Sequence, residues 1–197
     1  MKYIKNSYRK YSKVYNLIFF IISVGLSLGL IISLFLNKEL ISDIYNYFDS
    51  FINSYNSNVF SNILYPIITY FILFLLSLTI IGVFIPFLAL FIENMSIGLI
   101  LGVLLKFNGL KPLLFGIIYF IITKLLYIIL LLYLIINFYK FVISFIYALK
   151  NKNNTSIYNL YSKIIVKVLF SMLVITIYNL LGIFIIPKII KLFLFLL

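Results

Sequence analysis

Long apolar runs fill most of this 197-residue sequence, and several are long enough to cross a lipid bilayer. Hydrophobic residues make up 65% of the chain and charged residues 10%, whereas ordinary soluble domains have roughly 45–50% and about 25%. Because lipid offers no hydrogen-bond partners, continuous apolar runs of this kind satisfy their backbone groups by forming helices. The sequence therefore predicts an all-α, polytopic membrane helix bundle that occupies residues 1–197 as a single integral membrane domain.

Five runs have the length of a transmembrane helix, which needs about 20 mostly apolar residues. We predict spans at residues 15–36, 63–83, 87–105, 113–136 and 168–186. Only a short stretch with Gly82 and Pro86 separates the second and third spans, and this pair favours a tight turn or a kinked continuation. Asn108 and Gly109 are typical of a turn with positive φ before the fourth span.

The apolar run from Leu113 to Leu149 is too long for one straight span, because a helix rises about 1.5 Å per residue and the hydrocarbon core is about 30 Å thick. We expect the fourth span to end near Ile136, and Asn137–Lys150 to continue as an interfacial helix. A reentrant hairpin that turns near Thr123 and Lys124 is the alternative.

Basic residues precede the first span, and this arrangement favours a cytoplasmic N-terminus. They are Lys2, Lys5, Arg9, Lys10 and Lys13. A cleaved secretory signal is the competing interpretation. However, the apolar run at residues 17–36 is longer than a usual signal core and no small-residue cleavage site follows it, so we expect a retained signal anchor.

The segment between the first and second spans is polar and holds three of the four acidic residues, which predicts an external loop. Its apolar residues recur at helical intervals over residues 37–62, so we expect an amphipathic helix along the outer membrane surface. The same stripe is a candidate docking face for an extracytoplasmic partner. The residues that we assign to this external partner surface are Asp43, Tyr47, Asp49 and Phe51.

Glu93 and Asn94 lie inside the third predicted span, where a charged residue is a functional candidate by default. Lys124 is the one basic residue inside a predicted span, and it falls near mid-membrane like Glu93. Two interpretations stay open. The two charges form a pair that fixes helix register, or they belong to a site for transport, gating or proton relay.

Two pairs of glycines are spaced four residues apart inside predicted spans, and this spacing lets two helices approach closely. They are Gly25 and Gly29 in the first span, and Gly98 and Gly102 in the third. We interpret all four as helix-packing residues. The sequence leaves open whether the chain also forms a homo-oligomer.

The sequence contains no cysteine and no histidine, which removes thiolate and imidazole catalysis and most metal-centre chemistry. No hydroxyl side chain has a candidate base beside it, and no glycine-rich phosphate loop is present. The net charge of +12 comes from residues that flank the apolar runs, which argues against nucleic-acid binding. We therefore expect no enzyme activity, no cofactor and no bound metal.

The order of motifs between Ile80 and Gly116 is more informative than any one residue. The hairpin residues Ile81-Gly82 and Ile85-Pro86 are followed by Glu93-Asn94, Gly98, Gly102, Phe107-Asn108-Gly109-Leu110 and Leu114-Phe115-Gly116. This order resembles the stage II sporulation protein M family. The basic N-terminal tail, the first span and the external amphipathic stretch extend the resemblance over nearly the whole chain.

The resemblance implies a noncatalytic scaffold in the cell membrane that localises two peptidoglycan-degrading partners, stage II sporulation proteins D and P, during engulfment. Frequent Ile, Phe, Tyr, Asn and Lys residues indicate the AT-biased genome of a low-GC bacterium. The alternative function is a small transporter or permease subunit that uses the intramembrane Glu93 and Lys124.

Overall fold

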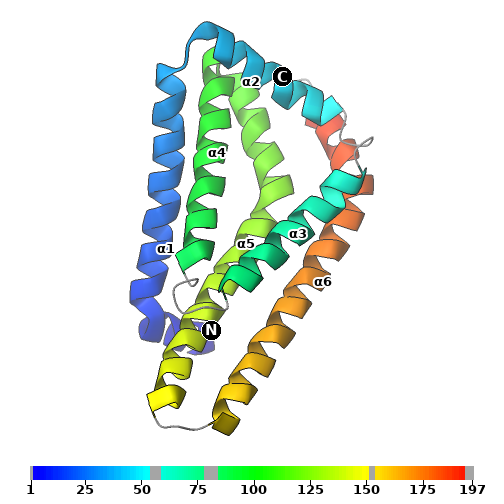
Figure 1. Ribbon diagram of the computed structural model, residues 1–197. Helices are drawn as coiled ribbons and strands as arrows, with labels where there is room; N and C mark the ends of the chain where they lie inside the picture. The colour runs from blue at the N-terminus through cyan, green and yellow to red at the C-terminus, as the bar shows by residue number, and fades with distance from the viewer. Residues whose placement is uncertain (1, 54–58, 78–83, 151–153, 194–197) are drawn as a thin grey trace.

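The computed structural model describes residues 2–53, 59–77, 84–150 and 154–193, and these residues form an all-α helix bundle without strands. Figure 1 shows the six helices that they make. The helices are α1 (Lys2–Phe35), α2 (Lys38–Asn53), α3 (Val59–Ser77), α4 (Ile85–Asn108), α5 (Leu110–Lys150) and α6 (Asn154–Phe193). The predicted all-α fold class is confirmed.

Four helices in the described part of the chain are long and apolar enough to cross a membrane. Their apolar segments are Tyr11–Phe35, Ile85–Phe107, Leu110–Lys150 and Ile157–Gly182. The second predicted span, at residues 63–83, falls on α3, whose described apolar part is the shorter Leu64–Ser77. The end of that predicted span lies outside the described residues, and so does Gly82.

Helices α1 and α4 lie side by side and run in the same direction (Figure 1), and they make the most extensive contact between any two helices. The glycines produce this contact. A Cβ atom at Gly29 would overlap the backbone of Met95 and Leu99, and one at Gly98 would overlap the backbone of Leu26. Helices α1 and α4 therefore touch backbone to backbone, as the two glycine pairs predict.

A tight turn at Gly109 connects α4 to α5. Gly109 has φ of +80°, and its N–H donates to the carbonyl oxygen of Leu105 at 3.1 Å. This φ favours glycine because it lies in the left-handed region. Pro86 is buried in the first turn of α4, where its missing N–H leaves no helical hydrogen bond unmade. The side chain of Asn108 lies outside the described residues.

Helix α5 is one continuous helix, so no reentrant hairpin turns at Thr123 and Lys124. The predicted end of the fourth span near Ile136, with an interfacial helix after it, stays a prediction. The helix continues past Ile136 because its next residues pack against α6. Phe141 is buried, and its ring lies 5.0 Å from the ring of Tyr161. Aromatic contacts thus continue the α5–α6 hairpin beyond the predicted span at residues 113–136.

Helix α6 is also longer than the predicted span at residues 168–186. It begins at Asn154 and continues beyond Pro187 to Phe193. Ile164 and Val168 are buried in the cluster that α6 shares with Tyr70 of α3 and Phe138 of α5. The part of α6 that precedes the predicted span therefore packs against α3 and α5.

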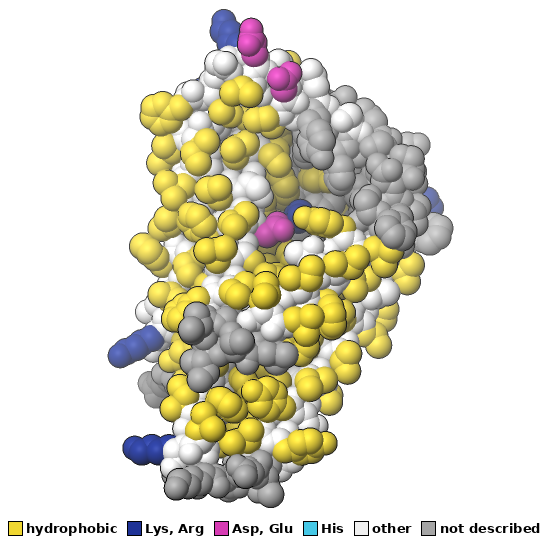
Figure 2. Space-filling model, viewed as in Figure 1, with side chains coloured by type: hydrophobic (Ala, Val, Ile, Leu, Met, Phe, Trp, Pro, Cys, Tyr) yellow, Lys and Arg dark blue, Asp and Glu magenta, His cyan; other side chains and the backbone are white. Residues whose placement is uncertain are grey.

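The core is distributed along the helix contacts. One cluster joins α4 to α5, a second joins α3, α5 and α6, and a third joins α1, α3, α4 and α5. Apolar side chains also cover the outside of the molecule, as Figure 2 shows. Phe19, Phe20 and Leu88 are among the exposed ones. An apolar exterior is what a bundle surrounded by lipid requires.

Helix α2 lies across one end of the bundle, roughly perpendicular to α1 and α4 (Figure 1). We call this the α2 end, and the opposite end, where the chain passes from α5 to α6, the hairpin end. The N-terminal turns of α1 are at the hairpin end. They are set off from the rest of α1 by Tyr11, whose backbone is not helical (φ −120°, ψ 24°).

Candidate polar site and outer surface

Glu93 and Lys124 form an ion pair between α4 and α5. Lys124 Nζ lies 3.2 Å from Glu93 Oε2. The pairing follows from the turn at Gly109, because two antiparallel helices that leave one turn bring residues at similar distances from it together. The sequence placed both charges near mid-membrane, and the structure brings them into contact.

The ion pair is partly open to the surroundings of the bundle. The exposed fractions of the side chains are 41% for Lys124 and 26% for Glu93. Figure 2 shows an acidic and a basic side chain together at mid-height of an otherwise apolar face. An unpaired charge that faced hydrocarbon at this position would cost free energy. The ion pair therefore neutralises both side chains on a surface that lipid, water or another protein contacts.

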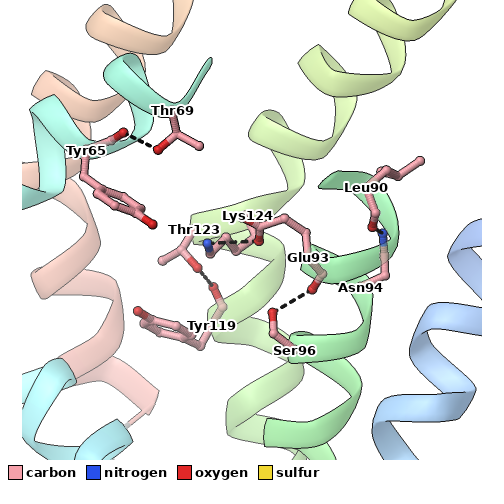
Figure 3. Close-up of polar contacts among 9 residues, drawn as sticks. All are labelled: Tyr65, Thr69, Leu90, Glu93, Asn94, Ser96, Tyr119, Thr123 and Lys124. Atoms are coloured by element: carbon pink, nitrogen blue, oxygen red, sulfur yellow. Dashed lines mark hydrogen bonds and ion pairs between the residues drawn. The ribbon is translucent and has the colours of Figure 1, made fainter. Parts of the chain in front are cut away.

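Hydroxyl groups lie close to the ion pair but are turned to the backbone of their own helices (Figure 3). Ser96 Oγ donates to the carbonyl oxygen of Glu93 at 2.9 Å, and Thr123 Oγ1 donates to that of Tyr119 at 2.8 Å. Tyr127 lies one turn after Lys124, with its ring centroid 6.0 Å from the ammonium nitrogen. Lys124 thus has an anion and an aromatic face as neighbours.

Asn94 has a different role from its neighbour Glu93. It is 3% exposed, and its Nδ2 donates to the carbonyl oxygen of Leu90 at 2.7 Å. A Cβ at Gly25 would lie 3.2 Å from the Asn94 Cβ, so Asn94 faces α1. The two adjacent polar residues therefore point to different helices, Glu93 to α5 and Asn94 to α1.

A second polar cluster joins α5 to α6, and our sequence analysis missed it. Lys167 Nζ donates to Asn137 Oδ1 at 2.7 Å, and Asn137 Nδ2 donates to the carbonyl oxygen of Tyr133 at 2.7 Å. Tyr70 and Ser171 line a cavity of about 10 Å³ beside this pair, which is close to the least space that holds one water molecule.

Lys167 was missed because the fifth span was predicted to begin after it. In the structure Lys167 lies inside the apolar helical segment Ile157–Gly182, so Lys124 is not the one cation within an apolar helix. Its helical spacing from the buried Ser171 was the available signal, since residues four apart share a helix face.

Helix α2 is held in place at both its start and its inner face. The side-chain oxygen Oδ1 of Asn37 accepts a hydrogen bond from the Leu40 N–H at 3.0 Å, which caps the helix. Ile41 is buried, and the Tyr45 ring stacks on Phe107 of α4 with centroids 4.1 Å apart. The amphipathic helix predicted from the sequence is therefore seated on the end of α4.

The acidic edge of α2 faces outward. Glu39 and Asp43 are exposed, and Figure 2 shows acidic side chains at the α2 end of the molecule. The side chains of the other predicted surface residues, Tyr47, Asp49 and Phe51, lie outside the described residues. Asp43 is thus the member of the predicted partner surface that the structure places.

The described residues contain no group of three or more acidic, histidine or cysteine side chains able to hold a metal ion. No protein-family model, curated protein sequence or solved structure matches this chain.

Proposed function

We propose that this chain is a noncatalytic scaffold of the cell membrane that holds extracytoplasmic, peptidoglycan-remodelling partners at its α2 end. In this proposal the N-terminus and the hairpin end are cytoplasmic. The positive-inside rule supports that orientation, since the basic N-terminal residues and Lys140, Lys150 and Lys163 belong to the hairpin end.

The observation that carries the proposal is the seating of α2. An amphipathic helix that was held by lipid alone would need no cap and no protein contact. Helix α2 has both, because Asn37 caps its start and Tyr45 stacks on Phe107. The result is a fixed platform with Glu39 and Asp43 on its open side. A rigid surface binds a partner with less loss of conformational entropy than a mobile one.

The motif residues that carry the resemblance to the stage II sporulation protein M family have structural roles. Gly98 contacts α1, Gly102 receives Ser33 of α1, and Gly109 makes the turn into α5. These are architectural tasks, as a scaffold requires. Stage II sporulation proteins D and P are the partners that this resemblance suggests.

Copurification tests the partner surface. The chain and the D-type or P-type wall hydrolase of the same organism are produced together, and the membrane protein is captured in mild detergent. We expect Asp43→Lys to reduce the recovered hydrolase by about fivefold or more. A lysine at this position would repel a partner surface whose positive charge complements the acidic edge of α2. Recovery of chain in the membrane shows that the variant folds.

Lys111→Glu is the matched control. Lys111 is exposed at the start of α5, so this change alters one charge near the same end of the molecule, but not in α2. Equal hydrolase recovery from the wild type and from Asp43→Lys would rule out the proposed surface. A loss of hydrolase recovery in Asp43→Lys that is mirrored by a gain in Lys111→Glu would mean that the overall charge of this end of the molecule, and not the α2 surface, controls binding.

A transporter or permease subunit is the second candidate, and the partial exposure of the Glu93–Lys124 pair favours it. A paired charge near mid-membrane that is open on one side can exchange its partner for a substrate ion. In proteoliposomes, Glu93→Gln should abolish cation or proton flux, while Glu39→Gln, the same change on the surface of α2, should preserve it. If the intact protein gives no flux, this candidate is excluded.

A further inference from the structure

The hairpin end of the molecule carries lysines with no acidic side chain near them. The sequence holds four acidic residues, and three of them belong to α2 at the opposite end. The fourth, Glu93, is paired with Lys124. The positive charge at the hairpin end therefore has no carboxylate side chain of this chain to balance it.

Lys167 is the most constrained of these lysines. Its ammonium donates one hydrogen bond, to Asn137 Oδ1 at 2.7 Å, and Asn137 is held in turn by the Tyr133 carbonyl. Asn137 is neutral, so this contact orients Lys167 without neutralising it. An ammonium group has three donors, and an anion beside Lys167 could use the others.

Two further lysines surround Lys167. Lys163 lies one turn away on the same face of α6, and Lys140 lies one turn from Asn137 on α5. Lys140 also lies 4.6 Å above the ring of Tyr11, which fixes it near the start of the apolar part of α1. Three lysines on neighbouring turns of α5 and α6 create a local positive potential, which attracts an anion.

The surroundings of Lys167 are apolar. Val166, Leu169 and Phe170 have exposed fractions of 63%, 59% and 64%. Lys167 itself lies inside the apolar segment Ile157–Gly182, and its ammonium group is turned to Asn137 of α5. A ligand that fits both features has an anionic head and hydrocarbon chains.

We propose that Asn137, Lys140, Lys163 and Lys167 bind the phosphate group of an anionic glycerophospholipid, with its acyl chains along Val166, Leu169 and Phe170. Phosphate accepts several charge-assisted hydrogen bonds from ammonium groups. Basic pockets between membrane helices bind such headgroups. This inference does not rest on the scaffold function, because it uses other residues at the other end of the molecule.

Native mass spectrometry of the purified full-length chain in detergent tests the site. Dioleoyl phosphatidylglycerol should bind more tightly than dioleoyl phosphatidylcholine. Lys163→Gln should weaken phosphatidylglycerol binding about fivefold, and adding Lys167→Gln should weaken it about fivefold again. Lys167→Arg keeps the charge, so it should retain most of the binding even where the glutamine variant is recovered poorly.

Lys188→Gln is the matched control, because Lys188 is an exposed lysine near the other end of the same helix. It should leave phosphatidylglycerol binding unchanged. Equal binding of the two lipids, or equal losses from Lys163→Gln and Lys188→Gln, would overturn the proposal. Binding of inorganic phosphate alone with the same lysine dependence, and without preference for phosphatidylglycerol, would overturn the assignment to a lipid.

Discussion

Single residues explain how the helices fit together. Glycines allow α1 and α4 to touch, and the turn at Gly109 aligns Glu93 with Lys124. The sequence indicated this ion pair because two charges at similar depth in consecutive spans have few other partners. It did not indicate the Lys167–Asn137 contact, because that contact depends on where α6 begins.

The ion pair should contribute coupling energy that a double-mutant cycle can measure. Glu93→Gln and Lys124→Gln each leave one charge without its partner, and the double variant removes both charges. We expect a coupling free energy of about 1–2 kcal/mol, between the values typical of exposed and buried pairs, since both side chains are partly exposed. Unfolding in sodium dodecyl sulfate measures it, and strictly additive effects would contradict the pairing.

Two glycine-to-alanine changes should differ strongly in how much they destabilise the helix bundle. Gly29→Ala places a methyl group against the backbone of Met95 and Leu99, which cannot move aside, and should lower the free energy of unfolding by about 1–3 kcal/mol. Gly116→Ala meets the ends of the Leu104 and Leu101 side chains, which can shift. Its helix-propensity gain of up to about 1 kcal/mol should offset most of that cost. Equal destabilisation of the two variants in the same detergent assay would refute this account of the α1–α4 contact.

At the scale of whole helices, hydropathy predicted which segments form long helices more accurately than it predicted where those helices begin and end. The apolar runs identified α1, α4, α5 and α6 as long apolar helices. The helices extend beyond the predicted spans where side chains from two helices pack against each other, as Phe141 and Tyr161 do. Glycine spacing indicated a close helix approach but not the partner, since the spacing alone does not distinguish one neighbouring helix from another.

The cap of α2 should control how firmly that helix is seated. Asn37→Ala removes the oxygen that accepts from the Leu40 N–H and should destabilise α2 by about 1 kcal/mol. Hydrogen exchange of the first α2 amides should then accelerate about fivefold. Ser42→Ala is the control, because the Ser42 hydroxyl donates to the Glu39 carbonyl at an exposed position and caps no N–H. Unchanged exchange in Asn37→Ala would show that the lipid surface, and not the cap, holds α2.

At the scale of the whole molecule, the two ends differ in charge and in construction. The α2 end presents a seated helix with acidic side chains, and the hairpin end presents lysines and an aromatic helix hairpin. Charge placement along the sequence indicated this asymmetry. It could not show that α2 rests on α4, because that contact is between Tyr45 and Phe107, far apart in sequence.

Labelling with a membrane-impermeant maleimide tests the proposed orientation. The chain has no cysteine, so each introduced thiol is a unique reporter. Asn46 on α2 and Ser162 on α6 are both exposed. We expect Asn46→Cys to react in intact cells and Ser162→Cys to react only after the cells are permeabilised. The reverse pattern would invert the topology and move the α2 surface away from the cell wall.

The most direct test of the scaffold proposal is photo-crosslinking from position 43 in living cells of the source organism. A photoreactive amino acid replaces Asp43, and the same amino acid at Ser162 provides the control. We predict that position 43, but not position 162, forms a crosslink with an extracytoplasmic peptidoglycan hydrolase that is identified by mass spectrometry. Crosslinks from position 43 to lipid alone, or the same crosslinked proteins from both positions, would contradict the proposal that α2 holds a wall-remodelling partner.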